Sequence, residues 1–158
     1  AGALSVTRAM DEAGCERVWE QRREFSYSLR DTGLTKLNED VVVPRGKLAA
    51  LVGFCESLQR ETGLDIACFG HAGDGNIHVN LMVNKDDPQE RARASQAERE
   101  LFERVVALEG SISGEHGIGF AKRPYLSIEL SADQIALMKR VKAAFDPAGI
   151  LNPGKIFP

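Results

Sequence analysis

All three histidines of this 158-residue chain lie in two short glycine-rich segments, a clustering that favours a shared chemical role. His71 and His78 flank a segment with two glycines, which allow the backbone to turn tightly and return one imidazole beside the other. Glu115 and His116 lie together in the second segment, residues 113–119. Two imidazoles and one carboxylate, with coordination positions left open, are a common catalytic ligand set for Zn²⁺, Mn²⁺ or Fe²⁺. The residue types therefore predict a divalent-metal site built from His71, His78 and Glu115.

Simpler interpretations of the same residues stay open at this point. A histidine in a glycine-rich turn is commonly a capping or hydrogen-bonding residue, and the spacing of His71 and His78 matches no common metal motif. Asp74, in a Gly-Asp-Gly turn, is either a plain turn residue or a rival to Glu115 as the carboxylate ligand. Arg22, in a charged stretch, is more typical of a solvated helix face than of an anion clamp.

Composition restricts the classes of protein to which the chain can belong. With 43% apolar and 27% charged residues, it is typical of one soluble globular domain. A formal net charge of −3 gives no electrostatic reason to expect nucleic acid or an anionic membrane as a partner. No apolar run approaches the roughly 18 residues that span a bilayer. Three cysteines without a C-x-x-C pair favour a reducing cytoplasm, where we expect them to be small buried residues.

Helices and strands must bring the two histidine segments together. β-Branched and alternating runs predict strands, and apolar residues at helical spacing predict helices. The expected strands are residues 40–43, 66–69 and 77–83, and the expected helices are about 4–29 (interrupted near Gly14), 48–62, 88–108 and 131–145. Alternation along the third strand places His78 and Asn80 on one face and its apolar residues on the other. We therefore expect an α+β fold, an antiparallel sheet covered by helices.

Three segments resemble signatures of a known family. Residues 70–80, GHAGDGNIHVN, resemble the G-H-x-G-D-G-N-x-H-x-N segment of FAD-linked oxidases of the glycolate oxidase, D-lactate dehydrogenase and D-2-hydroxyglutarate dehydrogenase group. Residues 113–119, SGEHGIG, are similar to that family's second signature, and residues 145–155 to its C-terminal one. The motifs occur in order over essentially the whole chain. The resemblance implies that residues 1–158 form a single C-terminal, substrate-side domain.

The resemblance also implies roles for individual residues. His71, His78 and Glu115 match the family's metal ligands, for which we expect Zn²⁺ first and Mn²⁺ or Fe²⁺ as alternatives. His116 matches a residue held near flavin and substrate, the expected general base. Arg22 ends a W-x-x-R motif whose arginine binds the substrate carboxylate. Further substrate contacts are expected at Ser26, Asn80 and Lys36 (or Asn38, in an ungapped alignment on Pro44), and cofactor contacts at Asn76 and Asn152.

The flavin of that family is held mostly by a larger N-terminal domain, and nothing in these residues resembles it or a G-x-G-x-x-G dinucleotide motif. We therefore interpret the chain as the substrate- and metal-binding half of an FAD-dependent enzyme that oxidises a small 2-hydroxyacid. Without the FAD-binding domain as partner, it should be colourless and inactive. Two other classes remain open. One is a metal-dependent hydrolase in which the same ligands activate water, and the other is a non-catalytic domain that binds a small molecule or a subunit.

Overall fold

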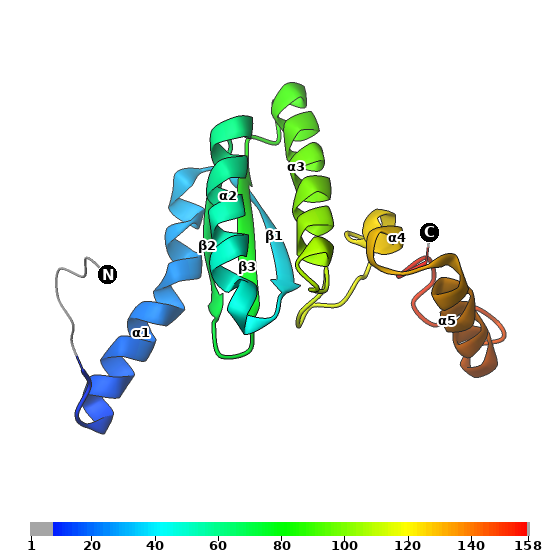
Figure 1. Cartoon of the computed structure of the whole chain (residues 1–158), viewed down its shortest axis with the longest axis horizontal. Coiled ribbons are helices and arrows are strands. Elements are labelled where there is room, and N and C mark those ends of the chain that lie inside the picture. Colours follow the sequence, from blue (N-terminus) through cyan, green and yellow to red (C-terminus); the bar gives the residue numbers. More distant parts are fainter. Residues whose placement is uncertain (1–7, 158) are drawn as a thin grey trace.

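A three-stranded antiparallel sheet forms the centre of the molecule (Figure 1). The computed structural model describes residues 8–157, except for the side chains of Phe25 and Ser26. The strands run in the spatial order β1–β3–β2, and their bounds are Thr35–Val42 for β1, Asp65–His71 for β2 and Asn76–Val83 for β3. Both pairings are antiparallel. Together with the helices, this sheet confirms the predicted α+β class.

Two helices, α2 (Leu48–Thr62) and α3 (Pro88–Ala107), cover one face of the sheet (Figure 1). The apolar core lies between them and that face, as the alternation and the helical stripes predict. Its fully or nearly fully buried members include Val41, Leu51, Cys55, Leu58, Ile77, Val79, Leu81, Ala97, Leu101, Phe102 and Val105. Each large apolar side chain buried there stabilises the fold by roughly 1.5–3 kcal/mol. This layer fixes the sheet, and the sheet in turn positions the histidines.

Local signals determine where the helices begin and end. The Asp87 side chain accepts hydrogen bonds from the backbone N–H groups of Gln89 (2.8 Å) and Glu90 (3.3 Å), which caps α3, and Pro88 occupies its first turn. α2 ends at Gly63, whose N–H donates to the carbonyl of Gln59. Ser131 and Gln134 form the capping box that starts the last helix.

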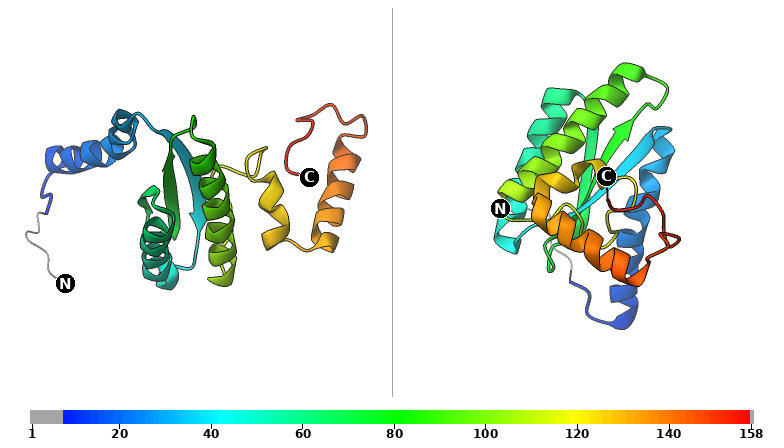
Figure 2. Two further views of the ribbon diagram at one scale, coloured as in Figure 1. Left: turned by 90° about the horizontal axis from the view of Figure 1, so that it is seen from above. Right: turned by 90° about the vertical axis from the view of Figure 1, so that its right-hand side faces the viewer.

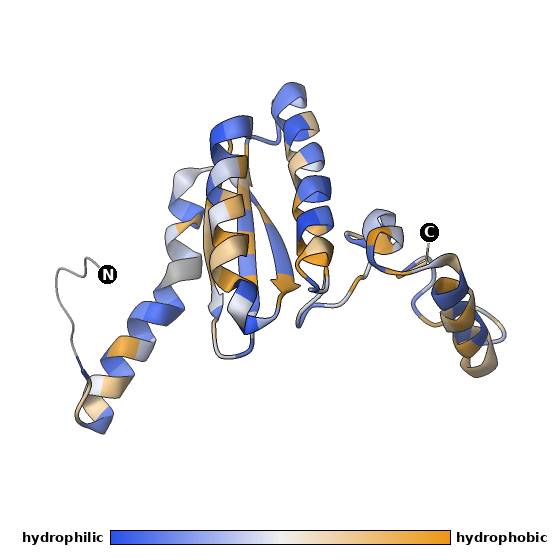
Figure 3. Ribbon diagram, viewed as in Figure 1, coloured by the Kyte–Doolittle hydropathy of each residue, from blue (hydrophilic) through white to orange (hydrophobic). Residues whose placement is uncertain are grey.

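The terminal helices extend away from this core (Figures 1 and 2). α1 (Glu12–Ser28) lies on the opposite side of the sheet from α2 and α3, and α5 (Ala132–Phe145) lies to the side of α3, away from α2. Within the described part of the chain, no residue of α5 is buried, although the helix is partly apolar (Figure 3). The remaining short elements are η1 (Arg30–Thr32), η2 (Arg45–Lys47), η3 (Arg123–Tyr125) and α4 (Leu126–Glu129).

Several expectations about the elements were wrong. β1 begins at Thr35 rather than at residue 40. The polar residues of its first half face the site or a buried polar cluster, so this half lacks the alternation of apolar and polar residues that predicts a strand. α1 begins only at Glu12, so residues 8–11 are not helical as expected, and it is continuous through Gly14, whose N–H donates to the capping carboxylate of Asp11 (2.6 Å). The predicted residues 4–7 lie outside the described ones. Cys15 is exposed rather than buried. Among residues 8–157, no helix is both long and apolar enough to cross a bilayer.

Candidate metal centre and substrate pocket

A tight hairpin positions the first two histidines. β2 ends at His71 and β3 begins at Asn76, so a four-residue turn separates the strands. Gly75 in this turn has φ 77°, and its carbonyl accepts a hydrogen bond from the N–H of Val43 (3.0 Å). A Cβ at Gly75 would collide with the Val43 carbonyl, so the close approach requires glycine here. His78 follows in β3 and lies on the same face of the sheet as His71. The hairpin therefore places one imidazole beside the other, as the glycine-rich segment predicts.

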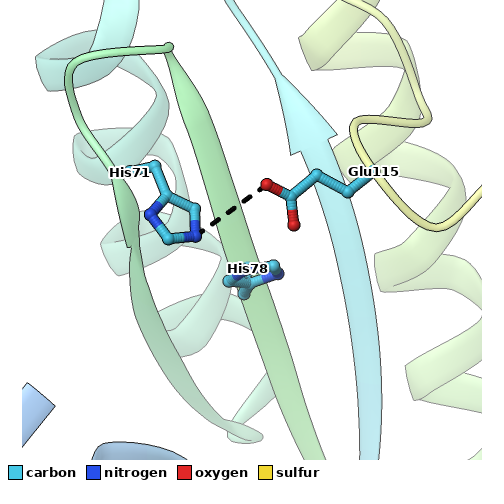
Figure 4. A group of neighbouring side chains, drawn as sticks. All are labelled: His71, His78 and Glu115. Atoms are coloured by element: carbon cyan, nitrogen blue, oxygen red, sulfur yellow. Dashed lines mark ion pairs between the residues drawn. The ribbon is translucent and has the colours of Figure 1, made fainter. Parts of the chain in front are cut away.

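The loop after α3 brings the third predicted ligand. Ser111 pairs with Val42 through two backbone hydrogen bonds (2.8 and 3.1 Å), which attach the loop to the end of β1. The chain then turns at Gly114, whose N–H donates to the carbonyl of Asp40 (3.2 Å). Glu115 follows, and its side chain points toward His71 (Figure 4). The three candidate ligands therefore meet at one place, although they come from β2, β3 and a loop more than thirty positions later in the chain.

The geometry of these three side chains fits a divalent cation. Each of His71, His78 and Glu115 offers one ligand atom, and these atoms lie within 4.8 Å of one another. His71 Nε2 is 3.9 Å from Glu115 Oε1, and the two imidazole centroids are 5.8 Å apart (Figure 4). One ion with ligand distances of about 2.0–2.2 Å can be shared after small side-chain movements. The donor set of two imidazoles and one carboxylate is the one that Zn²⁺, Mn²⁺ and Fe²⁺ accept.

The environment of His78 favours the neutral imidazole that a metal ligand must be. Burial lowers the pKa of His78, and the nearby His116 lowers it further, while the Asp40 carboxylate opposes the shift. Nδ1 of His78 is buried and has no hydrogen-bond partner among the residues that the structure describes. A buried polar atom without a partner is uncommon in folded proteins and often marks a functional site.

A small pocket adjoins the candidate metal ligands. Its volume is about 210 Å³, and it is lined by Arg22, Lys36, Asn38, Phe69, His78 and His116. Two of these side chains, Arg22 and Lys36, are cationic and could bind an anion. The His116 ring stacks on His78 with the centroids 5.6 Å apart and 25° between the planes. The pocket thus combines one candidate metal ligand, His78, with two cationic groups and an additional imidazole.

Comparison with known proteins identifies the family. Residues 1–156 match the family described as FAD linked oxidases, C-terminal domain. The chain belongs to this family. The resemblance drawn from the three sequence motifs is therefore confirmed.

Relatives of this FAD-linked oxidase domain are longer proteins. The glycolate oxidase subunit GlcD of Bacillus subtilis is 41% identical over 155 residues, which are 98% of this chain and 33% of that protein. D-lactate dehydrogenase of Anaerostipes hadrus is 38% identical over 159 residues, 99% of this chain and 33% of its own length. D-2-hydroxyglutarate dehydrogenase of Stutzerimonas stutzeri is 36% identical over 160 residues, 98% of this chain and 34% of its own length. The chain spans about a third of the length of these relatives.

A solved structure supports the fold of this oxidase domain. The 4-ethylphenol oxidase from Gulosibacter chungangensis, in complex with isoeugenol, superposes on 79% of this chain and 25% of its own chain. The TM-score is 0.54 at 22% sequence identity, a likeness that concerns the fold alone.

Not every predicted site residue of this oxidase domain reaches the pocket. The amide of Asn80 is fully buried and donates to the carbonyls of Ala67 (2.9 Å) and His78 (3.1 Å). Asn76 directs its amide to Asp40 and Val41 instead of toward the pocket. Asn152 lies in the C-terminal tail, where its side-chain oxygen accepts a hydrogen bond from Lys155 (3.1 Å). The Ser26 side chain lies outside the described residues.

Sequence reasoning missed two buried charged residues behind the site. Asp40 is 0% exposed and accepts hydrogen bonds from the backbone of Glu115 (2.5 Å) and His116 (2.8 Å). Lys122 is 4% exposed and donates to the carbonyls of Asp40 (2.6 Å) and Ile112 (2.7 Å). One signal for Asp40 was present in the sequence, since a charged residue directly before a run of three valines has little access to water.

Proposed function

We propose that this domain is the substrate- and metal-binding part of an FAD-dependent oxidoreductase that oxidises a small 2-hydroxyacid to the 2-oxoacid. One observation supports this most strongly: the ligand atoms of His71, His78 and Glu115 lie within 4.8 Å of one another. They adjoin a pocket that contains Arg22 and Lys36. The names of its relatives, glycolate oxidase, D-lactate dehydrogenase and D-2-hydroxyglutarate dehydrogenase, all denote enzymes of such hydroxyacids.

Oxidation of a 2-hydroxyacid removes a hydride from C2 and a proton from the hydroxyl group. A divalent ion, Zn²⁺ in our proposal, would act as Lewis acid on the hydroxyl and one carboxylate oxygen. His71 and His78 would hold it through neutral imidazole nitrogens, and Glu115 through one carboxylate oxygen. Glu115 is exposed and His71 half-exposed, so both can move to close the ligand set.

His116 is the proposed general base. A neutral imidazole accepts a proton at physiological pH, and His116 lines the same pocket as the cationic side chains. Its backbone N–H is fixed by Asp40 (2.8 Å), and its ring rests against His78. His116 is therefore held next to the candidate metal centre without being needed as a ligand.

Arg22 and Lys36 are proposed to bind the substrate carboxylate. A guanidinium can form two parallel hydrogen bonds with a carboxylate, and an ammonium adds a point charge. Nη2 of Arg22 lies 3.3 Å from Nε2 of His71. If this His71 nitrogen binds a metal ion, its lone pair can no longer accept a hydrogen bond from Arg22. Metal binding would then release the guanidinium toward the substrate.

The hydride acceptor is proposed to be FAD held by a partner domain. Flavins supply hydride-accepting chemistry that amino-acid side chains lack. The face of the sheet that carries the site is not covered by α2 and α3, and large apolar side chains stay exposed on both terminal helices, including Trp19 and Phe145. An N-terminal FAD-binding domain of the same full-length protein, docked on that side, would complete the pocket and cover such surfaces.

Titration of the chain with Zn²⁺ tests the metal site. We expect one equivalent to bind the wild-type protein, with stoichiometric binding abolished by Glu115→Gln. Asp74→Asn is the matched control, because Asp74 is the nearby carboxylate that the sequence left as an alternative ligand. Isothermal titration calorimetry on all three proteins provides the comparison. Absence of binding by wild-type protein, or its loss in Asp74→Asn alone, would contradict the proposed ligand set.

A further inference from the structure

Asp40 is a buried anion directly behind the candidate metal centre. It is 0% exposed, and an ionised carboxylate removed from water is costly unless hydrogen bonds compensate. Asn76 Nδ2 donates to its Oδ1 (2.6 Å), and the backbone N–H groups of Glu115 (2.5 Å) and His116 (2.8 Å) donate to its Oδ2. Three hydrogen-bond donors thus face the two carboxylate oxygens, an arrangement that suits the ionised, acceptor-only form of the side chain.

The donors to Asp40 belong to segments far apart in the sequence. Asn76 begins β3, whereas Glu115 and His116 lie 75 and 76 residues after Asp40 in the glycine-rich turn. The turn passes so close to the carboxylate that a Cβ at Gly114 would collide with the Asn76 amide and with Asp40 Oδ1. Glu115 and His116 are both exposed, and the stack of the His116 ring on His78 is a single contact. Their main-chain bonds to Asp40 fix where this turn sits.

Asp40 also faces His78 across the sheet. The two residues are register partners on β1 and β3, and Asp40 Oδ1 lies 3.6 Å from His78 Nδ1. A shift of about half an ångström brings this pair to the usual N–H···O distance of about 3 Å. With its proton on Nδ1 and directed at Asp40, His78 keeps the lone pair on Nε2. A lone pair fixed on one nitrogen by a hydrogen bond at the other is what makes an imidazole an oriented metal ligand.

Lys122 fixes the main chain at the same position. Its ammonium group, nearly fully buried, donates to the carbonyls of Asp40 (2.6 Å) and Ile112 (2.7 Å). Ile112 lies just before the turn that carries Glu115. Lys122 thus connects β1 to the start of the loop after α3. The Asp40 side chain connects β1 to the turn in that loop that carries Glu115 and His116.

We propose that Asp40 is the positioning residue of the metal centre, setting the tautomer of His78 and the location of the turn that carries Glu115 and His116. Asp40 itself contacts neither substrate nor ion. The proposal rests on the proposed metal-binding function. The buried Asp40 carboxylate then orients two metal ligands, His78 and Glu115, together with the general base His116.

Asp40→Asn is the test variant, because it keeps the shape and removes the charge. Zn²⁺ should bind it about 10–100-fold more weakly than wild-type protein by calorimetry, the loss typical when a group that orients a ligand is removed. Ring ¹⁵N shifts should show the His78 proton leaving Nδ1, a change that a general loss of stability would not produce. Glu39→Gln is the matched control: it removes the adjacent buried carboxyl on the other face of β1 and should leave Zn²⁺ affinity and the His78 tautomer unchanged.

Amide hydrogen exchange gives a second measurement that needs neither metal nor a stable variant. In the wild-type chain, the amides of Glu115 and His116 should exchange much more slowly than that of Gly117, which has no acceptor in the described part of the chain. Slow exchange at both residues supports the proposal, and its loss in Asp40→Asn strengthens it. Fast exchange at both, or wild-type Zn²⁺ affinity in a folded Asp40→Asn protein, overturns it. If wild-type protein binds no Zn²⁺, the proposed metal site fails, and the exchange rates still decide whether Asp40 holds the turn.

Discussion

Glu39 and Asp40 are neighbours on β1, and their side chains leave opposite faces of the sheet. Glu39 lies on the face covered by α2 and α3, where burial raises its pKa to about 7, Lys122 opposes the shift and Glu98 adds to it. Asp40 lies on the face of the pocket, where its hydrogen bonds outweigh burial and lower its pKa. Both carboxyl groups are buried. Burial alone therefore does not set the charge state of a carboxyl group in this protein; the number of donors that face it does.

The difference extends to the two faces as a whole. The covered face is built from apolar side chains. It also contains one small polar cluster, made of Glu39, Glu98, Tyr125 and Lys122. The pocket face presents the candidate ligands, the cationic groups and polar atoms without partners in the described structure. We infer that the covered face contributes stability and the pocket face contributes function, at some expense of stability. Substitutions on the two faces should therefore differ in kind.

The largest expected effect is kinetic and belongs to the pocket face. In a full-length protein that contains this domain, His116→Ala should lower kcat by about 10²–10⁴-fold, because the proposed base acts in the transition state. Arg22→Ala should mainly raise KM, because carboxylate binding is made in both ground and transition states. Steady-state kinetics with a 2-hydroxyacid, alongside the thermal midpoint of unfolding, measures both.

Glu98→Gln, on the covered face, is the control for this pair. Glu98 accepts a hydrogen bond from Tyr125 (3.0 Å) and should affect the midpoint rather than kcat or KM. Near-normal turnover by a well-folded His116→Ala enzyme would remove His116 from the mechanism. Equal kinetic losses in the covered-face variant would show that the two faces are not functionally distinct.

The second prediction compares the two carboxyl groups by stability. Asp40→Ala should lower the free energy of unfolding by about 3 kcal/mol, because it removes the acceptor of three hydrogen bonds, one of them fully buried, and leaves a cavity. Glu39→Ala should cost clearly less at pH 7.5, because the charged form of Glu39 is already poorly stabilised. Urea denaturation of both variants at that pH measures the difference. Equal losses would mean that the donors around Asp40 contribute little.

Much of the covered face could be predicted from the sequence. Apolar residues alternate along β3 and recur at helical spacing along α3. These patterns are local, so they do not depend on how distant parts of the chain fold. The glycine-rich spacing between His71 and His78 likewise predicts a tight hairpin, because glycine readily adopts the positive φ that Gly75 has in the turn. Such features depend on residues close together in the chain.

The rest of the site depends on long-range register, which local patterns do not contain. Asp40 meets His78 only because β1 pairs with β3, and it meets Glu115 only through the loop after α3. The first half of β1 was missed because Asn38 and Glu39 are polar yet point to opposite faces. Asn80 was assigned to substrate on family grounds, whereas its amide bonds the sheet backbone.

The smallest expected effect is a pH dependence on the covered face. The folded-state pKa of Glu39, about 7, lies above the ordinary value of 4.5, so between these values the folded protein holds a proton that the unfolded chain has lost. Stability should therefore fall as pH rises from about 4.5 to 7 and stay reduced above that range. Glu39→Gln removes this titration. It should raise the free energy of unfolding at pH 8 by about 1–3 kcal/mol relative to wild-type protein, with little gain at pH 4.5.

The comparison with wild-type protein isolates Glu39 from other groups that titrate nearby. The lowered pKa of His78 gives a slope of the opposite sign below pH 6.5, because a folded state that resists protonation loses stability in acid. That slope is common to both proteins, so it cancels in the difference. Urea midpoints measured from pH 4.5 to 8 should thus separate progressively and then run parallel above pH 7. Superimposed profiles would show that Glu39 ionises normally, and the contrast between the two faces of β1 would then rest on Asp40 alone.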